Sequence, residues 1–223
     1  MLRKILALTV GLLSVAVCLQ SRGGIIAQYP FTSSSYASTD TEANSSAGDI
    51  TKGAGLSGSS TFSTTLGNLS PCFFMYKNDL ANSFNINNND YISFVVTASS
   101  GWVLNLNGGS MTFDFASGAN NKAVNWAVRS SVDSYGADIA TGSTTSTTFS
   151  QGTASLTTSY DNLSTITFRI YGWTPDNQDL LFDNIILNGV VAVPEPVNVA
   201  LAVFGLSVVG AGVGRRIYLR ARA

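Results

Sequence analysis

Between residues 91 and 187, apolar side chains recur at every second position in a series of short runs. In residues 91–97, Ile92, Phe94 and Val96 share one face of an extended chain. The same alternation is found at Trp102, Leu104 and Leu106, at Met111, Phe113 and Phe115, at Val124, Trp126 and Val128, and at Ile166, Phe168 and Ile170. Alternation with Gly, Asn, Ser and Asp between the runs is typical of half-buried strands. We therefore expect an all-β chain of about eight to ten strands, folded as a jelly-roll-like β-sandwich.

The other segments carry weaker patterns. Residues 32–60 are rich in Ser, Gly and Thr and predict at most short edge strands. Residues 141–148, nearly all Ser and Thr, predict an exposed connection between strands. Cys72, within the sequence Pro-Cys-Phe-Phe-Met, is expected in a buried strand. Trp102 and Trp126 alternate in phase with aliphatic neighbours and are expected in the core.

A second constraint is the uncharged, mostly apolar run at residues 197–214. A helix of this length measures roughly 27 Å, just enough to cross a hydrocarbon core of about 30 Å. Arginines follow it at Arg215, Arg216, Arg220 and Arg222. Because cytoplasmic flanks carry the excess of Lys and Arg, these four residues predict that the tail stays in the cytoplasm.

Directly before this run stands a Val-Pro-Glu-Pro motif, formed by Val193, Pro194, Glu195 and Pro196. The order of motif, apolar helix and arginines resembles the PEP-CTERM sorting signal of Gram-negative bacteria. The resemblance implies recognition by an exosortase in the inner membrane and cleavage near the motif. It also implies cargo that is exported and associated with extracellular polysaccharide or biofilm matrix. The alternative is an ordinary single-pass anchor with an incidental Pro-Glu-Pro.

The amino-terminal end predicts export. Arg3 and Lys4 precede an apolar run at residues 5–19, as in a secretory signal peptide, with Ala27 as the expected cleavage position. Cys18 follows Val17 rather than the small residue of a lipoprotein signal. The expected division is a signal peptide at 1–27, an exported domain at 28–192 and a sorting signal at 193–223. The domain would pass through a periplasmic, membrane-held intermediate to the cell surface or matrix.

Charge and residue types exclude several functions. Seven of the 12 basic residues lie in the two end segments, and 12 of the 13 acidic residues lie between them. The middle is therefore acidic, which argues against a nucleic-acid partner. The chain has no histidine, so Ser-His-Asp and Cys-His catalysis and histidine-bearing zinc sites are excluded. Without Cys18, Cys72 is alone and no internal disulfide can form.

A second resemblance covers most of residues 91–189. The stretches Asn125–Tyr135, Thr-Phe-Arg-Ile-Tyr-Gly-Trp and Leu-Leu-Phe-Asp-Asn-Ile-Ile-Leu-Asn-Gly resemble the exported jelly-roll domain common in PEP-CTERM cargo. The last is also similar to the final strand of many carbohydrate-binding modules, where an aspartate helps to hold a structural calcium ion. That resemblance implies Asp183 as a calcium ligand; Asp40, Glu42 and Asp49 are the candidates for the amino-terminal ligands. The alternative is a buried acid that accepts backbone hydrogen bonds.

Two aromatic residues are candidates for ligand contact. Tyr171 and Trp173 lie on the face opposite Ile166, Phe168 and Ile170, so they are expected as sugar-stacking platforms unless loops bury them. Arg129 and Arg169 also face away from the apolar stripes, and we expect each to form a structural ion pair with a sheet aspartate. An oxygen-rich turn at Asp176, Asn177 and Asp179 is expected to be solvated.

These patterns favour an exported, non-catalytic surface or matrix protein that binds extracellular polysaccharide. A purely structural envelope protein is the alternative. A glycoside hydrolase, which needs two carboxylates flanking a cleft, is the third possibility, with Asp114, Asp133 and Asp138 as its candidates. We expect no catalytic residue.

Overall fold

The computed structural model describes residues 23–40, 42–56, 58–65 and 71–194. Contacts divide the chain into two units, Met1–Ala192 and Val193–Ala223, and the strands of the described residues belong to the first. That unit is an all-β sandwich of two antiparallel sheets. The apolar amino-terminal run, Glu195, Pro196, the second apolar run and its arginines lie outside the described residues. Within the described ranges, no helix has the length and hydropathy to cross a membrane.

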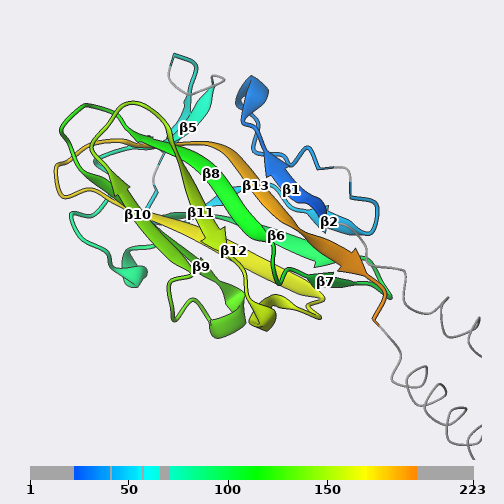
Figure 1. Cartoon of the computed structure of the whole chain (residues 1–223). Helices are drawn as coiled ribbons and strands as arrows, with labels where there is room; N and C mark the ends of the chain where they lie inside the picture. The colour runs from blue at the N-terminus through cyan, green and yellow to red at the C-terminus, as the bar shows by residue number, and fades with distance from the viewer. Residues whose placement is uncertain (1–22, 41, 57, 66–70, 195–223) are drawn as a thin grey trace, which may run out of the picture. The chain divides into compact units, whose positions relative to one another are not determined.

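One sheet has seven strands and is built around the long strand β13 (Leu180–Ala192). Its main path runs β11–β8–β13–β5–β4, and β1 and β7 also pair with β13. The other strands of this sheet are β1 (Gly24–Tyr29), β4 (Thr61–Ser63), β5 (Cys72–Met75), β7 (Val103–Asn105), β8 (Ser110–Ser117) and β11 (Ser150–Ser155). Figure 1 shows β8, β13 and β1 side by side in this layer.

The second sheet has six strands in the order β10–β9–β12–β6–β2, with β3 also paired to β6. Its strands are β2 (Ser45–Ala47), β3 (Thr51–Lys52), β6 (Tyr91–Ala98), β9 (Val124–Ser130), β10 (Ala140–Thr144) and β12 (Thr165–Trp173). Four single turns of 3-10 helix interrupt the connections at η1 (Thr32–Ser34), η2 (Ile86–Asn88), η3 (Ser131–Asp133) and η4 (Thr158–Tyr160).

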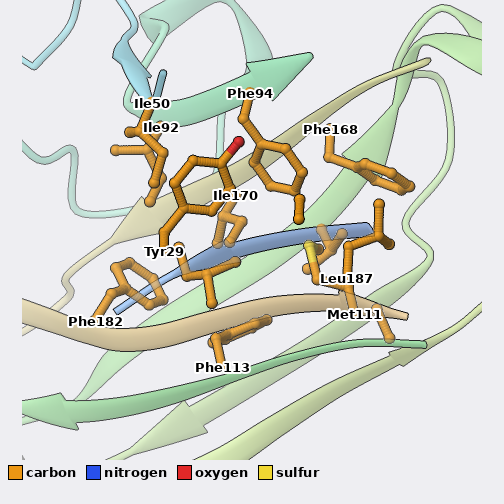
Figure 2. Close-up of a cluster of buried hydrophobic side chains, with 14 of the residues drawn as sticks. Tyr29, Ile50, Ile92, Phe94, Met111, Phe113, Phe168, Ile170, Phe182 and Leu187 are labelled. Carbon is orange, nitrogen blue, oxygen red and sulfur yellow. The ribbon is translucent and has the colours of Figure 1, made fainter. Parts of the chain in front are cut away.

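The core fills the space between the two sheets. Figure 2 shows Phe94, Phe168 and Ile170 of the six-stranded sheet facing Phe113, Phe182 and Leu187 of the seven-stranded sheet. Tyr29 joins them from β1: its ring lies 5.0 Å from that of Phe94, and its hydroxyl donates to the Gly48 carbonyl at 2.6 Å. Burial of alternating apolar residues from both sheets is the main stabilising term of such a sandwich.

The strand predictions from alternation are confirmed at β6, β7, β8, β9 and β12, and the short edge strands at β2 and β3 are confirmed as well. The prediction of a connection at residues 141–148 is wrong over its first half, where β10 forms. Its inward positions are Ala140 and Gly142, which give no apolar stripe. A Cβ at Gly142 would lie 2.3 Å from the Trp126 ring, so the strand needs small residues there. β11 was not predicted either, because Gly152 stands at one of its inward positions, where a large apolar residue would have no room.

The amino-terminal boundary expected at Ala27 falls inside a strand. β1 pairs with β13 over Gly24–Tyr29, and Ile26 and Ala27 are fully buried. A chain beginning at Gln28 would keep only the last two residues of β1. A cut after Ala27 would therefore remove side chains that the core of this structure buries, and the cleavage position stays a prediction.

Candidate binding site on the six-stranded sheet

The outer face of the six-stranded sheet carries a cluster of arginines and aromatic rings. Antiparallel register places Arg169 of β12 directly opposite Arg129 of β9 and opposite Ser93 of β6. Tyr171 lies opposite Tyr91 in the next outward-facing row. Because side chains alternate along a strand, these residues all point away from the core. We call Phe84, Tyr91, Arg129, Tyr135, Arg169, Tyr171 and Trp173 the arginine–aromatic cluster.

Arg169 is the centre of this cluster. Its Cζ lies 4.2 Å from the Tyr91 ring centroid and 3.7 Å from that of Tyr135, so the guanidinium makes a cation–π contact with each ring. Nη1 donates to the Tyr171 hydroxyl at 3.2 Å. Burial lowers the pKa of Arg169, but the Tyr171 hydrogen bond and the surrounding tyrosines outweigh it, so the net shift is upward. The group is a fixed positive charge.

Arg129 holds the adjacent loop in place. Its Nε donates to Asp138 Oδ1 at 2.5 Å and its Nη1 donates to the Tyr135 carbonyl at 2.8 Å. Its guanidinium also lies 4.6 Å from the Phe84 ring centroid. The Arg129 side chain is only 12% exposed, so this ion pair is partly shielded from water and fixes the geometry of the loop.

The loop after β9 carries a strained backbone. Ser134 and Tyr135 have φ angles of 58° and 63°, a left-handed conformation that bulky residues rarely adopt. Two hydrogen bonds stabilise this backbone conformation. The Tyr135 N–H donates to the Ser130 carbonyl at 2.8 Å, and the Ala137 N–H donates to the Asp133 carboxylate at 2.8 Å. The result is that the Tyr135 ring lies on Arg169.

The two predicted stacking residues lie in this cluster but are not equally accessible. Tyr171 is 1% exposed, and the rings of Phe84 and Tyr91 pack against it at 5.5 and 5.2 Å. Its ring therefore supports its neighbours instead of offering a free face. Trp173 lies 5.3 Å from Phe84 and is half-buried, so it is the more accessible of the two residues.

Asp183 lies on the outer face of the other sheet and is fully buried. It pairs in register with Asp114 of β8, beside a bulge at Asn184, whose φ is 50°. The Asn184 N–H donates to Asp183 at 2.9 Å and its side-chain amide donates to Asp114 at 3.1 Å. The described residues form no group of three His, Cys, Asp or Glu side chains suited to a metal ion. Calcium at Asp183 therefore stays a prediction.

Cys72 is also buried on the outer side of the seven-stranded sheet. Burial, with a smaller effect from Asp183, raises the pKa of its thiol to about 12. A thiol with this pKa is protonated at neutral pH and is a poor nucleophile.

The carboxylates considered for hydrolysis come from two different sheets and have structural partners. Asp114 belongs to β8 in the seven-stranded sheet, whereas Asp133 and Asp138 belong to the loop after β9 in the other sheet. Asp133 accepts a backbone N–H and Asp138 accepts from Arg129, so both have structural partners. Two residues of the oxygen-rich turn likewise act on the backbone: Asp176 accepts from the Ala123 N–H and Asp179 from the Lys77 N–H.

The expectation of an ion pair for each arginine holds for Arg129, although its partner Asp138 is in a loop. It is wrong for Arg169, which has no carboxylate partner among the described residues. Tyr91 precedes the inward-facing Ile92, so alternation along this strand already indicated that the Tyr91 side chain points outward. The Tyr135 ring reaches Arg169 because its loop has a left-handed backbone, and no pattern in the sequence predicted that contact.

No family model matches the chain, and no curated protein gives a significant match. Among solved structures, the K3 cleaved adhesin domain of Lys-gingipain from Porphyromonas gingivalis is 15% identical, with 74% of this chain and 98% of that chain covered and a TM-score of 0.42. The CBM22-1 xylan-binding domain of Paenibacillus barcinonensis Xyn10C is 11% identical, covering 77% and 97%, with a TM-score of 0.41. The C-terminal family 22 carbohydrate-binding module of Clostridium thermocellum Xyn10B is 10% identical, covering 77% and 96%, also at 0.41. These likenesses concern β-sandwich architecture alone.

Proposed function

We propose that this chain is an exported, non-catalytic protein of the cell surface or extracellular matrix that binds polysaccharide through the arginine–aromatic cluster. The observation that carries the proposal is the placement of Arg169, Tyr91, Tyr135 and Trp173 together on one outward-facing sheet surface. One face of a pyranose ring presents C–H bonds that pack on aromatic rings. A guanidinium supplies several fixed donors for the sugar oxygens.

The architecture suits such a role. The order β5–β13–β8–β11 in one sheet and β6–β12–β9–β10 in the other is that of a jelly roll, and we infer that topology for the domain. A jelly roll offers a broad, rigid sheet face on which side chains from adjacent strands are held in register. The cluster uses three adjacent strands, β6, β12 and β9, in this way.

The two ends of the sequence support the proposed route. The basic and apolar amino-terminal segment directs export. The Val-Pro-Glu-Pro motif with its apolar run and four arginines is the proposed substrate of an exosortase-type enzyme in the inner membrane. Processing there would deliver the sandwich to the cell surface or to the extracellular matrix, where polysaccharide is available.

Retention on immobilised polysaccharides tests the binding proposal. The soluble domain, residues 23–192, should be retained by at least one member of a panel that includes matrix polysaccharide from the producing bacterium. Trp173→Ala and Tyr135→Ala should weaken retention because each removes a ring face from the cluster. Phe149→Ala is the matched control, since Phe149 is half-buried on the other sheet. Failure to bind any polysaccharide would contradict the proposal and leave a purely structural envelope protein.

A further inference from the structure

The arginine–aromatic cluster contains two of the few basic side chains of an acidic domain. The described residues include five basic side chains and 12 acidic ones, yet two of the five, Arg129 and Arg169, are direct cross-strand neighbours. Residues paired in this way have Cβ atoms about 4.5–5.5 Å apart, and like charges there are destabilising. A carboxylate opposite either arginine would stabilise the sheet, because opposite charges attract in a cross-strand pair.

Only one of the two charges is neutralised within the described part of the chain. Asp138 pairs with Arg129, and Arg169 contacts tyrosines alone. Tyrosine rings attract a cation but leave its net charge in place. Arg169 is therefore a cation with no ion-pair partner among the described residues, beside a second arginine whose carboxylate partner is Asp138.

The geometry also leaves donors for a ligand. Nη1 of Arg169 uses one proton on Tyr171, and Nη2 donates to none of the described residues. Nε is buried and unpaired, so a ligand meets the terminal end of the guanidinium. The two ring contacts and the hydrogen bond to Tyr171 hold the guanidinium in place before a ligand arrives, which lowers the entropic cost of binding. A planar carboxylate matches two parallel N–H donors of such a group.

We infer that the cluster selects an acidic polysaccharide, with the carboxylate of a uronic acid residue bound at Arg169 and flanked by Arg129. This inference rests on the proposed polysaccharide binding and names its substrate class. The aromatic rings contact the sugar ring while the guanidinium pair receives its carboxylate. The negative charge of the bound carboxylate would then reduce the repulsion between the two arginines.

The test compares polymers that differ only in charge. Polygalacturonate, alginate and hyaluronate are each presented to the soluble domain beside the same polymer with its carboxyl groups reduced to alcohols. The domain should bind at least one acidic polymer, and reduction should weaken that binding about tenfold or more, since a charge-assisted hydrogen bond is replaced by a neutral one. The affinity for the acidic polymer should also fall as salt is raised.

Variants locate the effect. Arg169→Gln should abolish the preference for the acidic polymer, whereas Lys122→Gln, which removes the same charge from an exposed residue that is not a member of the cluster, should leave it intact. Arg169→Lys should be intermediate, because it keeps the charge and loses the planar donors. The comparison of acidic and reduced polymers needs no variant, so it stands even if Arg169→Gln fails to fold.

The outcomes separate this inference from the function beneath it. Equal binding of acidic and reduced polymers, or binding of neutral polymers only, would overturn the uronate inference and leave polysaccharide binding in place. Loss of binding to every polysaccharide would overturn both.

Discussion

Removing the first four residues of β1 should destabilise the domain measurably. Ile26 is fully buried, and its Cδ1 occupies the space over Gly189, where an added Cβ would meet it at 2.8 Å. A domain that begins at Gln28 leaves that space empty. Truncating one buried Ile to Ala costs about 2–5 kcal/mol, and the shortened chain also loses the buried Ala27. We expect residues 28–192 to be less stable than residues 23–192 by about 3–5 kcal/mol, a drop of roughly 10 °C in melting temperature.

Urea unfolding followed by tryptophan fluorescence measures this difference, with Ile26→Ala in the longer chain as the intermediate case. Gly189→Ala should destabilise the longer chain, and it should do so less when Ile26 is already Ala, because the two side chains compete for the same space. Stabilities of 23–192 and 28–192 within about 0.5 kcal/mol would refute the reasoning. Mass spectrometry of the mature protein should accordingly find an amino terminus at Gly24 or earlier.

Three further predictions follow from buried acids and from the sorting signal. Cys72, with its thiol pKa raised to about 12, should resist a thiol reagent at pH 8 in the folded domain and react only on unfolding; fast reaction of the native protein would contradict its burial. Burial raises the pKa of Asp90 above 3.8, so the folded state holds that proton more tightly than the unfolded chain, and the unfolding free energy falls as pH rises from 3.8 through the folded pKa. Asp90→Asn should remove that decline in urea titrations across this range, and an unchanged pH profile would show that another group causes it. In a host with an exosortase the mature protein should lack residues 196–223, whereas an intact tail with and without the enzyme would leave a plain membrane anchor.

The sequence predicted the sandwich because its large apolar side chains alternate along the strands. Ile92, Phe94 and Phe168 mark their strands unambiguously, since each occupies an inward position. β10 and β11 escaped the same analysis because their inward positions are small residues that make room for Trp126 and Phe113. Alternation therefore identifies the strands that place large side chains in the core. It misses the strands whose small inward residues pack against those side chains.

The binding site was predictable only in part. Alternation identified Tyr171 and Trp173 as outward-facing, but it could not show that neighbouring rings bury Tyr171. The pairing of Arg169 with Arg129 depends on strand register between segments 40 residues apart, and no local pattern specifies it. The contact of Tyr135 with Arg169 requires a left-handed loop backbone, which is set by hydrogen bonds rather than by composition.

Locating the bound sugar on the domain tests the central claim most directly. In a titration with oligosaccharide from the matrix polysaccharide of the producing bacterium, nuclear magnetic resonance should show the largest shifts at the Arg169 and Arg129 side chains and the Trp173 indole. Signals from the outer face of the seven-stranded sheet, such as Phe149, should stay unchanged. Shifts centred on that other face, or no shifts at saturating oligosaccharide, would contradict the account.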